Sequence, residues 1–359
     1  MTIDFTRDRW DKIREDACRW WTGELRRPLI QMTLGGRDPG RAEPALPPAR
    51  RTAHYDFSVP AADIVDRWDY DLSRIRFLGD AFPSRWPDFG PGVIAAFLGG
   101  KTVVAPDTVW FQPREDLPIS ELRFSHNADT IWFNRVQDMC RAALDRWEGL
   151  VQIGTTDLGG NLDILSSFRP SEGLLLDLYD YSDEVKRLTW DAHEAWWAYF
   201  DDLNGLLQPV NPGYTAWTAI YSEGPYYMLQ CDFCYMISPD MFDEFVKPEL
   251  AASCKRLVNP FYHLDGPGCL PHLDSLLSIE ELKGVQWVPG DGQPGVDHWP
   301  HVYRKIRDAG KRIQFWGTIQ TFETIVEQLG SAEGIVFMGS AQAADEPEVL
   351  DFLRRYHVI

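Results

Sequence analysis

The sequence predicts an α/β protein, a (β/α)8 TIM barrel with an N-terminal helix and a hairpin-bearing excursion after the second strand. Short apolar segments alternate with helix-forming stretches along the chain, which is typical of a closed parallel barrel. An open doubly wound sheet is the alternative, but no Gly-x-Gly-x-x-Gly turn follows the first apolar segment. The eight predicted strands are Leu29–Leu34, Ser73–Leu78, Val151–Thr155, Tyr214–Tyr221, Asn259–His263, Gly284–Val288, Arg312–Trp316 and Gly334–Met338.

Helix signals precede and follow these segments. Residues 1–27 predict an amphipathic helix, because tryptophan and aliphatic residues recur there every three or four positions. Ser182-Asp-Glu predicts an acidic first turn for a helix that runs to Leu207. Ser238 and the proline after it predict an N-cap and an N1 proline before Met241–Leu250.

We expect one domain over residues 1–359. Residues 81–129 are too long and too rich in glycine and proline for a turn, so they predict a hairpin-bearing, lid-like insertion over one end of the barrel. Residues 40–60 predict an irregular surface loop.

Composition argues against several classes of function. With 35 Lys and Arg against 54 Asp and Glu, the net charge of −19 repels phosphate backbones and disfavours a nucleic acid partner. No apolar run is long enough to cross a bilayer, and the N-terminus is too charged for a signal peptide, so a cytoplasmic protein is expected. Six cysteines in 359 residues do not indicate a disulfide framework.

Polar residues gather after the predicted strands, at the end of a barrel where active sites lie. Asp80 could act as a general acid or anchor a substrate, and a loop cap is an equally good interpretation. Arg37 could bind a substrate carboxylate in a bidentate fork or form a surface salt bridge. Asp157 follows the third predicted strand at the same end.

A second group surrounds the aromatic turn that ends at Tyr227. Glu223, Gln230 and Asp232 would suit a hydroxylated or amide-bearing ligand, although hydrogen bonding within the loop explains them almost as well. The adjacent Cys231-x-x-Cys234 could be a redox pair or half a zinc site. No second pair of this kind accompanies it, so two buried thiols are the favoured interpretation.

The segment from Tyr262 to Gly268 is the most informative. His263 and Asp265 lie two residues apart at a strand end and therefore point the same way, as a metal half-site or an acid–base pair requires. Asp291, at the end of the next strand, could complete a His-Asp-Asp metal set. A lone histidine is usually structural, but the two carboxylates favour a functional role.

Aromatic residues make up 13% of the chain, and many of them must lie in the core. Those near the predicted strand ends indicate an aromatic wall able to hold a methylated cation or an aromatic ether. The residues of this wall are Trp217, Tyr221, Tyr226, Trp287 and Trp316.

From about Leu29 to the C-terminus, the chain resembles the uroporphyrinogen decarboxylase-like superfamily. That superfamily has a (β/α)8 fold and includes the methylcobalamin:thiol methyltransferases. Gln31–Arg37 is similar to the Arg-bearing glycine turn of the decarboxylases, and Ile75–Asp80 is similar to their strand that ends in a catalytic aspartate. The other similar segments are Thr155–Leu176, Ile237–Pro248 and Tyr262–Gly266.

The chain departs from both activities that this resemblance implies. The decarboxylases keep a histidine after the last strand, where this chain has Gly339 and Ser340. The thiol methyltransferases bind zinc through a His-x-Cys pair and a later Cys; here His263 is kept, Asp265 replaces the first Cys, and Ser340 lies in the region of the second. The remaining oxygen-rich set would bind zinc less tightly, but a metal could still act as a Lewis acid.

We therefore expect an enzyme that moves a methyl group from a small methylated substrate to a corrinoid or related carrier. In this hypothesis His263, Asp265 and Asp291 position a metal or a proton, while Asp80 and Glu223 orient the substrate. Zinc and a corrinoid (cobalamin) on a partner protein are the candidate cofactors, and a homodimer is the candidate assembly. The alternatives are a metal-free decarboxylase or lyase that uses Asp80 as its acid on a non-porphyrin substrate, and an inactive barrel that binds a small molecule.

Overall fold

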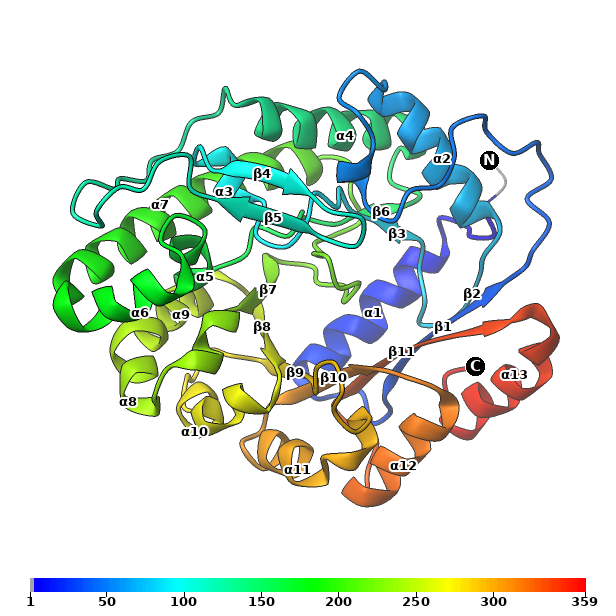
Figure 1. The fold of residues 1–359 in the computed structure, drawn as a ribbon. Coiled ribbons are helices and arrows are strands. Elements are labelled where there is room, and N and C mark those ends of the chain that lie inside the picture. Colours follow the sequence, from blue (N-terminus) through cyan, green and yellow to red (C-terminus); the bar gives the residue numbers. More distant parts are fainter. Residues whose placement is uncertain (1–2) are drawn as a thin grey trace.

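The computed structural model describes residues 3–359, which form a mixed α/β fold around a mostly parallel sheet (Figure 1). The strands of this sheet pair in the order β2-β1-β11-β10-β9-β8-β7, and β2 runs antiparallel to β1. The strands are β1 (Leu29–Gly35), β2 (Arg76–Gly79), β7 (Tyr226–Gln230), β8 (Asn259–Asp265), β9 (Gly284–Val288), β10 (Arg312–Trp316) and β11 (Ile335–Gln342).

Two small pairs of strands accompany the main sheet. β3 (Ser84–Arg85) and β6 (Gln152–Ile153) pair in parallel, whereas β4 (Lys101–Val104) and β5 (Val109–Gln112) form an antiparallel hairpin. This hairpin lies inside the insertion 81–129, where a hairpin was expected. Among residues 3–359, the strand pairings leave the seven-stranded sheet open between β2 and β7, so they do not by themselves make a closed barrel.

Two of the predicted strands were wrong. The segment Ser73–Leu78 begins inside helix α2, and only its end belongs to β2, which runs against the expected direction. The segment Tyr214–Tyr221 is not a strand, because backbone hydrogen bonds between Tyr214 and Ser222 (2.7 and 3.0 Å) close it into a loop. The sheet strand in this region is β7 instead, and all five of its residues are buried.

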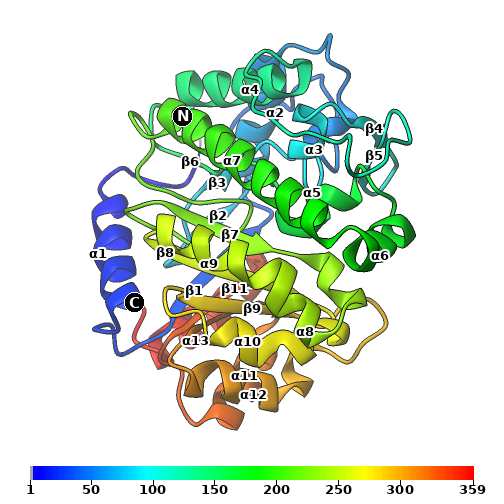
Figure 2. The same ribbon diagram turned by 90° about the vertical axis from the view of Figure 1, so that its left-hand side faces the viewer.

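Helices surround the sheet, with α1 on one side of the molecule and the β4–β5 hairpin on the opposite side (Figure 2). None of the helices described is both long and apolar enough to span a membrane. The α-helices are α1 (Arg9–Thr22), α2 (Ala61–Ser73), α3 (Ile94–Phe97), α4 (Ile131–Trp147), α5 (Asn161–Ser166), α6 (Ser171–Asp180), α7 (Ser182–Leu207), α8 (Pro239–Met241), α9 (Lys247–Arg256), α10 (Leu273–Leu277), α11 (Pro300–Asp308), α12 (Ile319–Leu329) and α13 (Glu346–Arg355). The shorter turns are η1 (Thr52–His54), η2 (Asp232–Met236), η3 (Phe242–Val246), η4 (Pro267–His272), η5 (Val296–His298) and η6 (Ala343–Asp345).

Local sequence explains several helix boundaries. Helix α7 spans the predicted range, and its first turn contains two acidic residues, which favour the positive end of the helix dipole. Ser238 caps α8, because its side-chain oxygen accepts a hydrogen bond from the N–H of Met241. The Thr130 and Thr318 side chains cap α4 and α12 in the same way.

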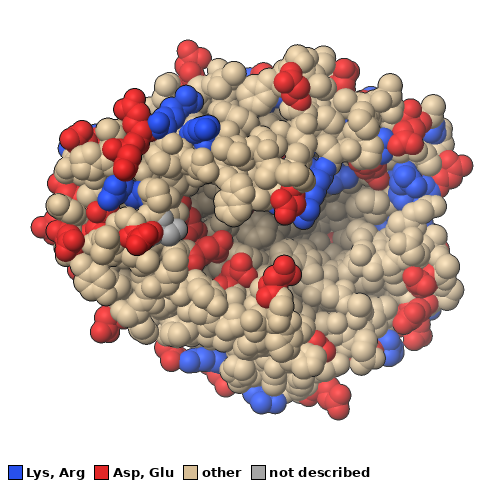
Figure 3. All heavy atoms as spheres, viewed as in Figure 1, with Lys and Arg blue, Asp and Glu red and all other residues tan. Residues whose placement is uncertain are grey.

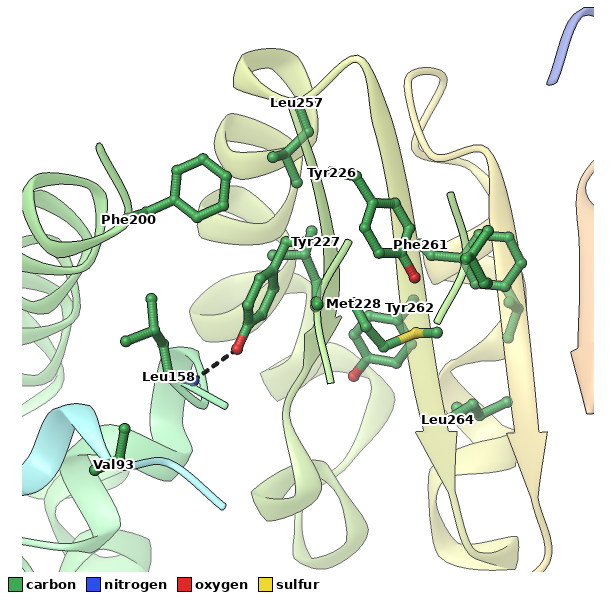
Figure 4. Close-up of a cluster of buried hydrophobic side chains, with 14 of the residues drawn as sticks. Val93, Leu158, Phe200, Tyr226, Tyr227, Met228, Leu257, Phe261, Tyr262 and Leu264 are labelled. Carbon is green, nitrogen blue, oxygen red and sulfur yellow. Dashed lines mark hydrogen bonds between the residues drawn. The ribbon is translucent and has the colours of Figure 1, made fainter. Parts of the chain in front are cut away.

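Large aromatic side chains fill the core between the sheet and its helices. Tyr226 and Tyr227 of β7 and Phe261 of β8 are completely buried. The Tyr227 hydroxyl accepts a hydrogen bond of 2.7 Å from the N–H of Leu158, so its polar atom has a partner inside the core (Figure 4). This packing joins β7 to the segment that follows β6.

Candidate metal and substrate site

One face of the main sheet carries a row of polar side chains. Gln230 stands opposite His263 in the strand register, His263 opposite Gln286, and Gln286 opposite Gln314. Because directly paired residues point to the same face of a sheet, these four side chains share one face. Gln286 and Gln314 are completely buried.

Hydrogen bonds along this row orient the histidine. The Gln286 amide Nε2 donates to Gln314 Oε1, which leaves Gln286 Oε1 to accept the Nδ1 proton of His263. A ring that donates from Nδ1 presents the lone pair of Nε2, as metal-ligating histidines commonly do. The His263 ring also packs edge-on against Trp217, with ring centroids 5.3 Å apart.

Three residues that could bind a metal meet at the carboxyl end of β7 and β8. They are Asp232, His263 and Asp265, each of which offers a ligand atom within 4.8 Å of the others. Asp265 Oδ1 is buried and has no hydrogen-bond partner among the described residues. A carboxylate oxygen is costly to bury without a partner, and carboxylate and imidazole together are a common donor set for divalent metals. The residues therefore fit a divalent cation.

A cavity of about 720 Å³ opens beside this group, under the β4–β5 hairpin. Gln230, Asp163 and Asp232 line one side of it, and Trp110 and Phe111 of β5 line another. Figure 3 shows the surface hollowed near the middle of this face, with acidic side chains at the margin of the hollow. The pocket thus combines carboxylates with an aromatic cover.

Burial and mutual repulsion perturb the carboxyl groups around the cavity. Burial raises the pKa of Asp157 to about 7. The hydrogen bonds that its carboxylate accepts from the N–H groups of Gly159 and Gly92 lower this pKa, but they offset only part of the rise. The pKa of Asp163 is raised well above its ordinary value by burial and by the Asp232 charge. The Asp232 residue as a whole is exposed on the pocket wall. Its carboxylate is still partly shielded from water by the surrounding atoms, which raises its pKa, and the interaction with His263 lowers it. Crowded carboxyls of this kind are typical of functional sites.

The structure brings some of the predicted site residues together. His263 and Asp265 meet as expected, Gln230 and Asp232 line the large cavity, and Asp157 lies buried behind it. Asp291 is exposed in the loop after β9 and is not a member of the three-residue group. Asp232, expected only to contact substrate, takes its place.

Asp80 lies at the other end of the sheet. Both of its carboxylate oxygens accept hydrogen bonds from Arg27 (2.8 and 2.9 Å), and the N–H of Ile30 adds a third (2.8 Å). Because β2 runs antiparallel to β1, the end of β2 reaches the amino end of β1, opposite the His263 end. Arg27 also binds Asp16 of α1 (2.8 Å), so this buried ion pair ties α1 to the sheet and does not belong to the site.

Three more predicted residues lie near α1. Glu223 is exposed and accepts a hydrogen bond from the Cys18 thiol (3.4 Å). The hydroxyl of Tyr221 donates to Pro212 O (2.9 Å), and Tyr226 pairs with the Thr218 hydroxyl (3.0 Å) in the core. None of the three belongs to the Asp232, His263 and Asp265 group.

The remaining predicted residues are dispersed. Trp287 is buried on the helix side of β9, against Trp299 (ring centroids 5.2 Å). Arg37 donates to Ser73 O (2.6 Å). Trp316 is partly exposed and lines a separate cavity of about 390 Å³ with Ser340 and other residues. The thiols Cys231 and Cys234 are both buried, as expected.

Sequence reasoning missed the glutamines that support His263. A signal was present, because β9 and β10 each contain a single glutamine in the middle of an otherwise largely apolar strand. It also missed Asp163, whose carboxylate accepts hydrogen bonds of 2.8 Å from the N–H groups of Asp232 and Phe233. That contact depends on the fold and has no local sequence signal.

No protein-family model matches the chain, and no curated protein sequence matches it significantly. Among solved structures, the chain resembles a methyltransferase from Methanosarcina mazei with a TM-score of 0.60 and 12% sequence identity. The match covers 96% of this chain and 99% of that chain. At this level of identity, the likeness shows that the chain shares the α/β fold of that methyltransferase over nearly its whole length.

Proposed function

We propose that the protein is a cytoplasmic methyltransferase that moves a methyl group from a small methylated substrate to a corrinoid or related carrier, with the help of a metal ion. The observation that carries this proposal is Asp265 Oδ1, which has no hydrogen-bond partner within residues 3–359 and lies beside a histidine whose Nδ1 donates to Gln286. The fold shared with a protein named methyltransferase supports the reaction class. Zinc is the proposed metal, and a partner protein would carry the corrinoid.

We also propose that the chain is one domain, a complete (β/α)8 barrel of the uroporphyrinogen decarboxylase-like type. In this view β3 and β6 span the opening between β2 and β7. A hydrogen bond of 2.9 Å from the N–H of Thr155 to Thr215 O supports it, because it continues from β6 toward β7.

In the proposed site, Asp232, His263 and Asp265 would hold the metal, which supplies a Lewis acid for the atom that bears the methyl group. Gln286 keeps the His263 ring in one orientation and one tautomer. Asp163 fixes the backbone at Asp232 through two hydrogen bonds.

The aromatic cover has a separate role in this proposal. Trp110 and Phe111 border the large cavity and would exclude water from it. Their ring faces would also attract a methylated cation.

The rival hypothesis of a metal-free decarboxylase depended on Asp80 as the acid. Both oxygens of Asp80 are taken by Arg27, at the far end of the sheet from the cavity. This arrangement favours the methyltransferase hypothesis.

Metal analysis of the purified protein tests the proposal. We expect close to one equivalent of bound divalent metal in the wild type and loss of both metal and methyl transfer to cob(I)alamin in Asp265→Asn. Asp291→Asn is the matched control, because this aspartate is exposed outside the group, and it should keep both. A wild-type protein that transfers methyl groups with no metal, or an Asp265→Asn variant with full activity, would contradict the proposal.

A further inference from the structure

A second cavity has a volume of about 220 Å³, and Trp217 forms part of its wall. Its walls come from the loop after β1, from α2, from β3 and the residues that follow it, and from Trp217. The Trp217 ring contacts the His263 ring, with centroids 5.3 Å apart. Trp217 therefore contacts both this cavity and one member of the metal group.

The cavity has an excess of positive charge. Arg50, Arg51 and Arg85 line it together with two acids, Asp71 and Asp88. Both acids are already engaged. Arg51 donates to the two oxygens of Asp88 (2.9 and 3.0 Å), and Asp71 accepts two hydrogen bonds (3.1 and 2.8 Å) from an arginine outside the cavity, Arg67.

Arg85 is left without an anionic partner. Within residues 3–359, its guanidinium makes no ion pair, and its Nε is buried without a hydrogen-bond partner. Burial lowers the pKa of Arg85, and Asp71 and Tyr55 only partly offset that effect. Proteins seldom hold a charged group in a largely buried position without an ion-pair partner, because removing the charge from water is costly.

Trp217 offers a second unmet donor to the same cavity. Its indole Nε1–H is buried and has no hydrogen-bond partner in the described part of the chain. Two buried N–H donors, one of them cationic, line a cavity whose acids are already paired. A ligand that satisfies both needs at least two acceptor atoms and a negative charge.

We propose that the cavity lined by Arg85 and Trp217 binds the carboxylate of the substrate, so that the substrate is a small methylated acid. A carboxylate matches the planar guanidinium and has two acceptor oxygens. Arg37, the arginine first expected to bind a carboxylate, instead donates to the Ser73 carbonyl. The proposal rests on the proposed function only for the statement that the substrate carries a methyl group. Binding of a carboxylate can be measured without any reaction.

The test compares acids with alcohols of similar shape. Glycine betaine is paired with choline, and methoxyacetate with 2-methoxyethanol. For each ligand, the shift of the thermal unfolding midpoint and the Kd from calorimetry are measured on the wild type, Arg85→Gln and Arg37→Gln, with and without prior chelation of metal. Inorganic phosphate is included as another anion.

We expect at least one acid to bind the wild type at least tenfold more tightly than its alcohol, with or without metal. Arg85→Gln should lose that preference, while Arg37→Gln should keep it. Without ligand, Arg85→Gln should unfold at the wild-type temperature or above, because it removes a largely buried charge that has no ion-pair partner among residues 3–359. This readout separates ligand binding from a structural role for Arg85.

Four results would overturn the inference: no acid preference in the wild type, an unchanged preference in Arg85→Gln, tighter binding of phosphate than of every acid, or a marked loss of ligand-free stability in Arg85→Gln. Failure of the two proposals is distinguishable. Acid binding through Arg85 without methyl transfer would refute only the proposed function. Methyl transfer that is indifferent to Arg85 would refute only the carboxylate site.

Discussion

Replacing Asp157 by asparagine should stabilise the protein far more at pH 8 than at pH 4.5. Asp157 is buried behind the large cavity, and burial raises its pKa from 3.8 to about 7. Between these two values the folded protein keeps a proton that the unfolded chain has released. The free energy of unfolding therefore falls as the pH rises from about 4 to 7.

The magnitude follows from the two pKa values. A pKa that moves from 3.8 to about 7 corresponds to about 4 kcal/mol of unfolding free energy, fully lost above pH 7. Asparagine cannot ionise, and its side-chain oxygen can still accept the hydrogen bonds from the N–H groups of Gly159 (2.9 Å) and Gly92 (3.4 Å). The variant should therefore gain up to about 4 kcal/mol at pH 8.

Urea unfolding at pH 4.5, 6 and 8 measures this difference. Asp163 and Asp232 titrate in both proteins, but the Asp157 charge also helps to raise the pKa of Asp163. The difference between the two proteins therefore reports Asp157 together with its repulsion of Asp163. Asp291→Asn is the control, because that side chain is exposed and its replacement should leave the pH profile unchanged. If Asp157→Asn and the wild type lose stability in parallel from pH 4.5 to pH 8, the reasoning is refuted.

Three further changes test other parts of the molecule. Asp80→Asn should cost about 3–5 kcal/mol in denaturant unfolding while the folded fraction keeps its turnover, because it breaks a buried ion pair outside the site; a normal stability with lost turnover would contradict this. Gly159→Ala should lower unfolding free energy by at least about 1 kcal/mol, since Gly159 has a φ of +69° and a Cβ would lie 2.7 Å from Gly92 Cα; an unchanged urea midpoint would show that the backbone adjusts. Gln286→Leu should weaken metal binding by about 10- to 100-fold in chelator competition, and equal affinity would exclude a role for Gln286 in orienting His263.

Local sequence predicted the parts of the fold that depend on local physics. The strands β1, β8, β9 and β10 and the helix α7 were predicted within a residue or two, because apolar runs and acidic first turns are local signals. The direction of β2 was not predictable, since strand direction depends on the pairing partner. Asp80 therefore lies at the amino end of β1, whereas the carboxyl end was expected.

The same distinction applies to the candidate site. The period of two along β8 predicted that His263 and Asp265 share a face. Asp232 joins them only because β7 pairs with β8, and β7 was not among the predicted strands. Tyr221 and Tyr226 are of a residue type that often lines ligand pockets, yet both pack in the core. The sequence did not reveal this, because aromatic content alone does not distinguish a cavity wall from packed interior.

The polar row on the sheet has a consequence for folding. Successive residues of a strand point to opposite faces, so a slip of one residue would turn Gln286 or Gln314 toward the apolar helix layer. An amide in that layer would lose its hydrogen bonds, and no water would be there to replace them. Misaligned versions of the sheet are thereby penalised, and the side chains that orient the imidazole also enforce the correct alignment of the strands that carry them.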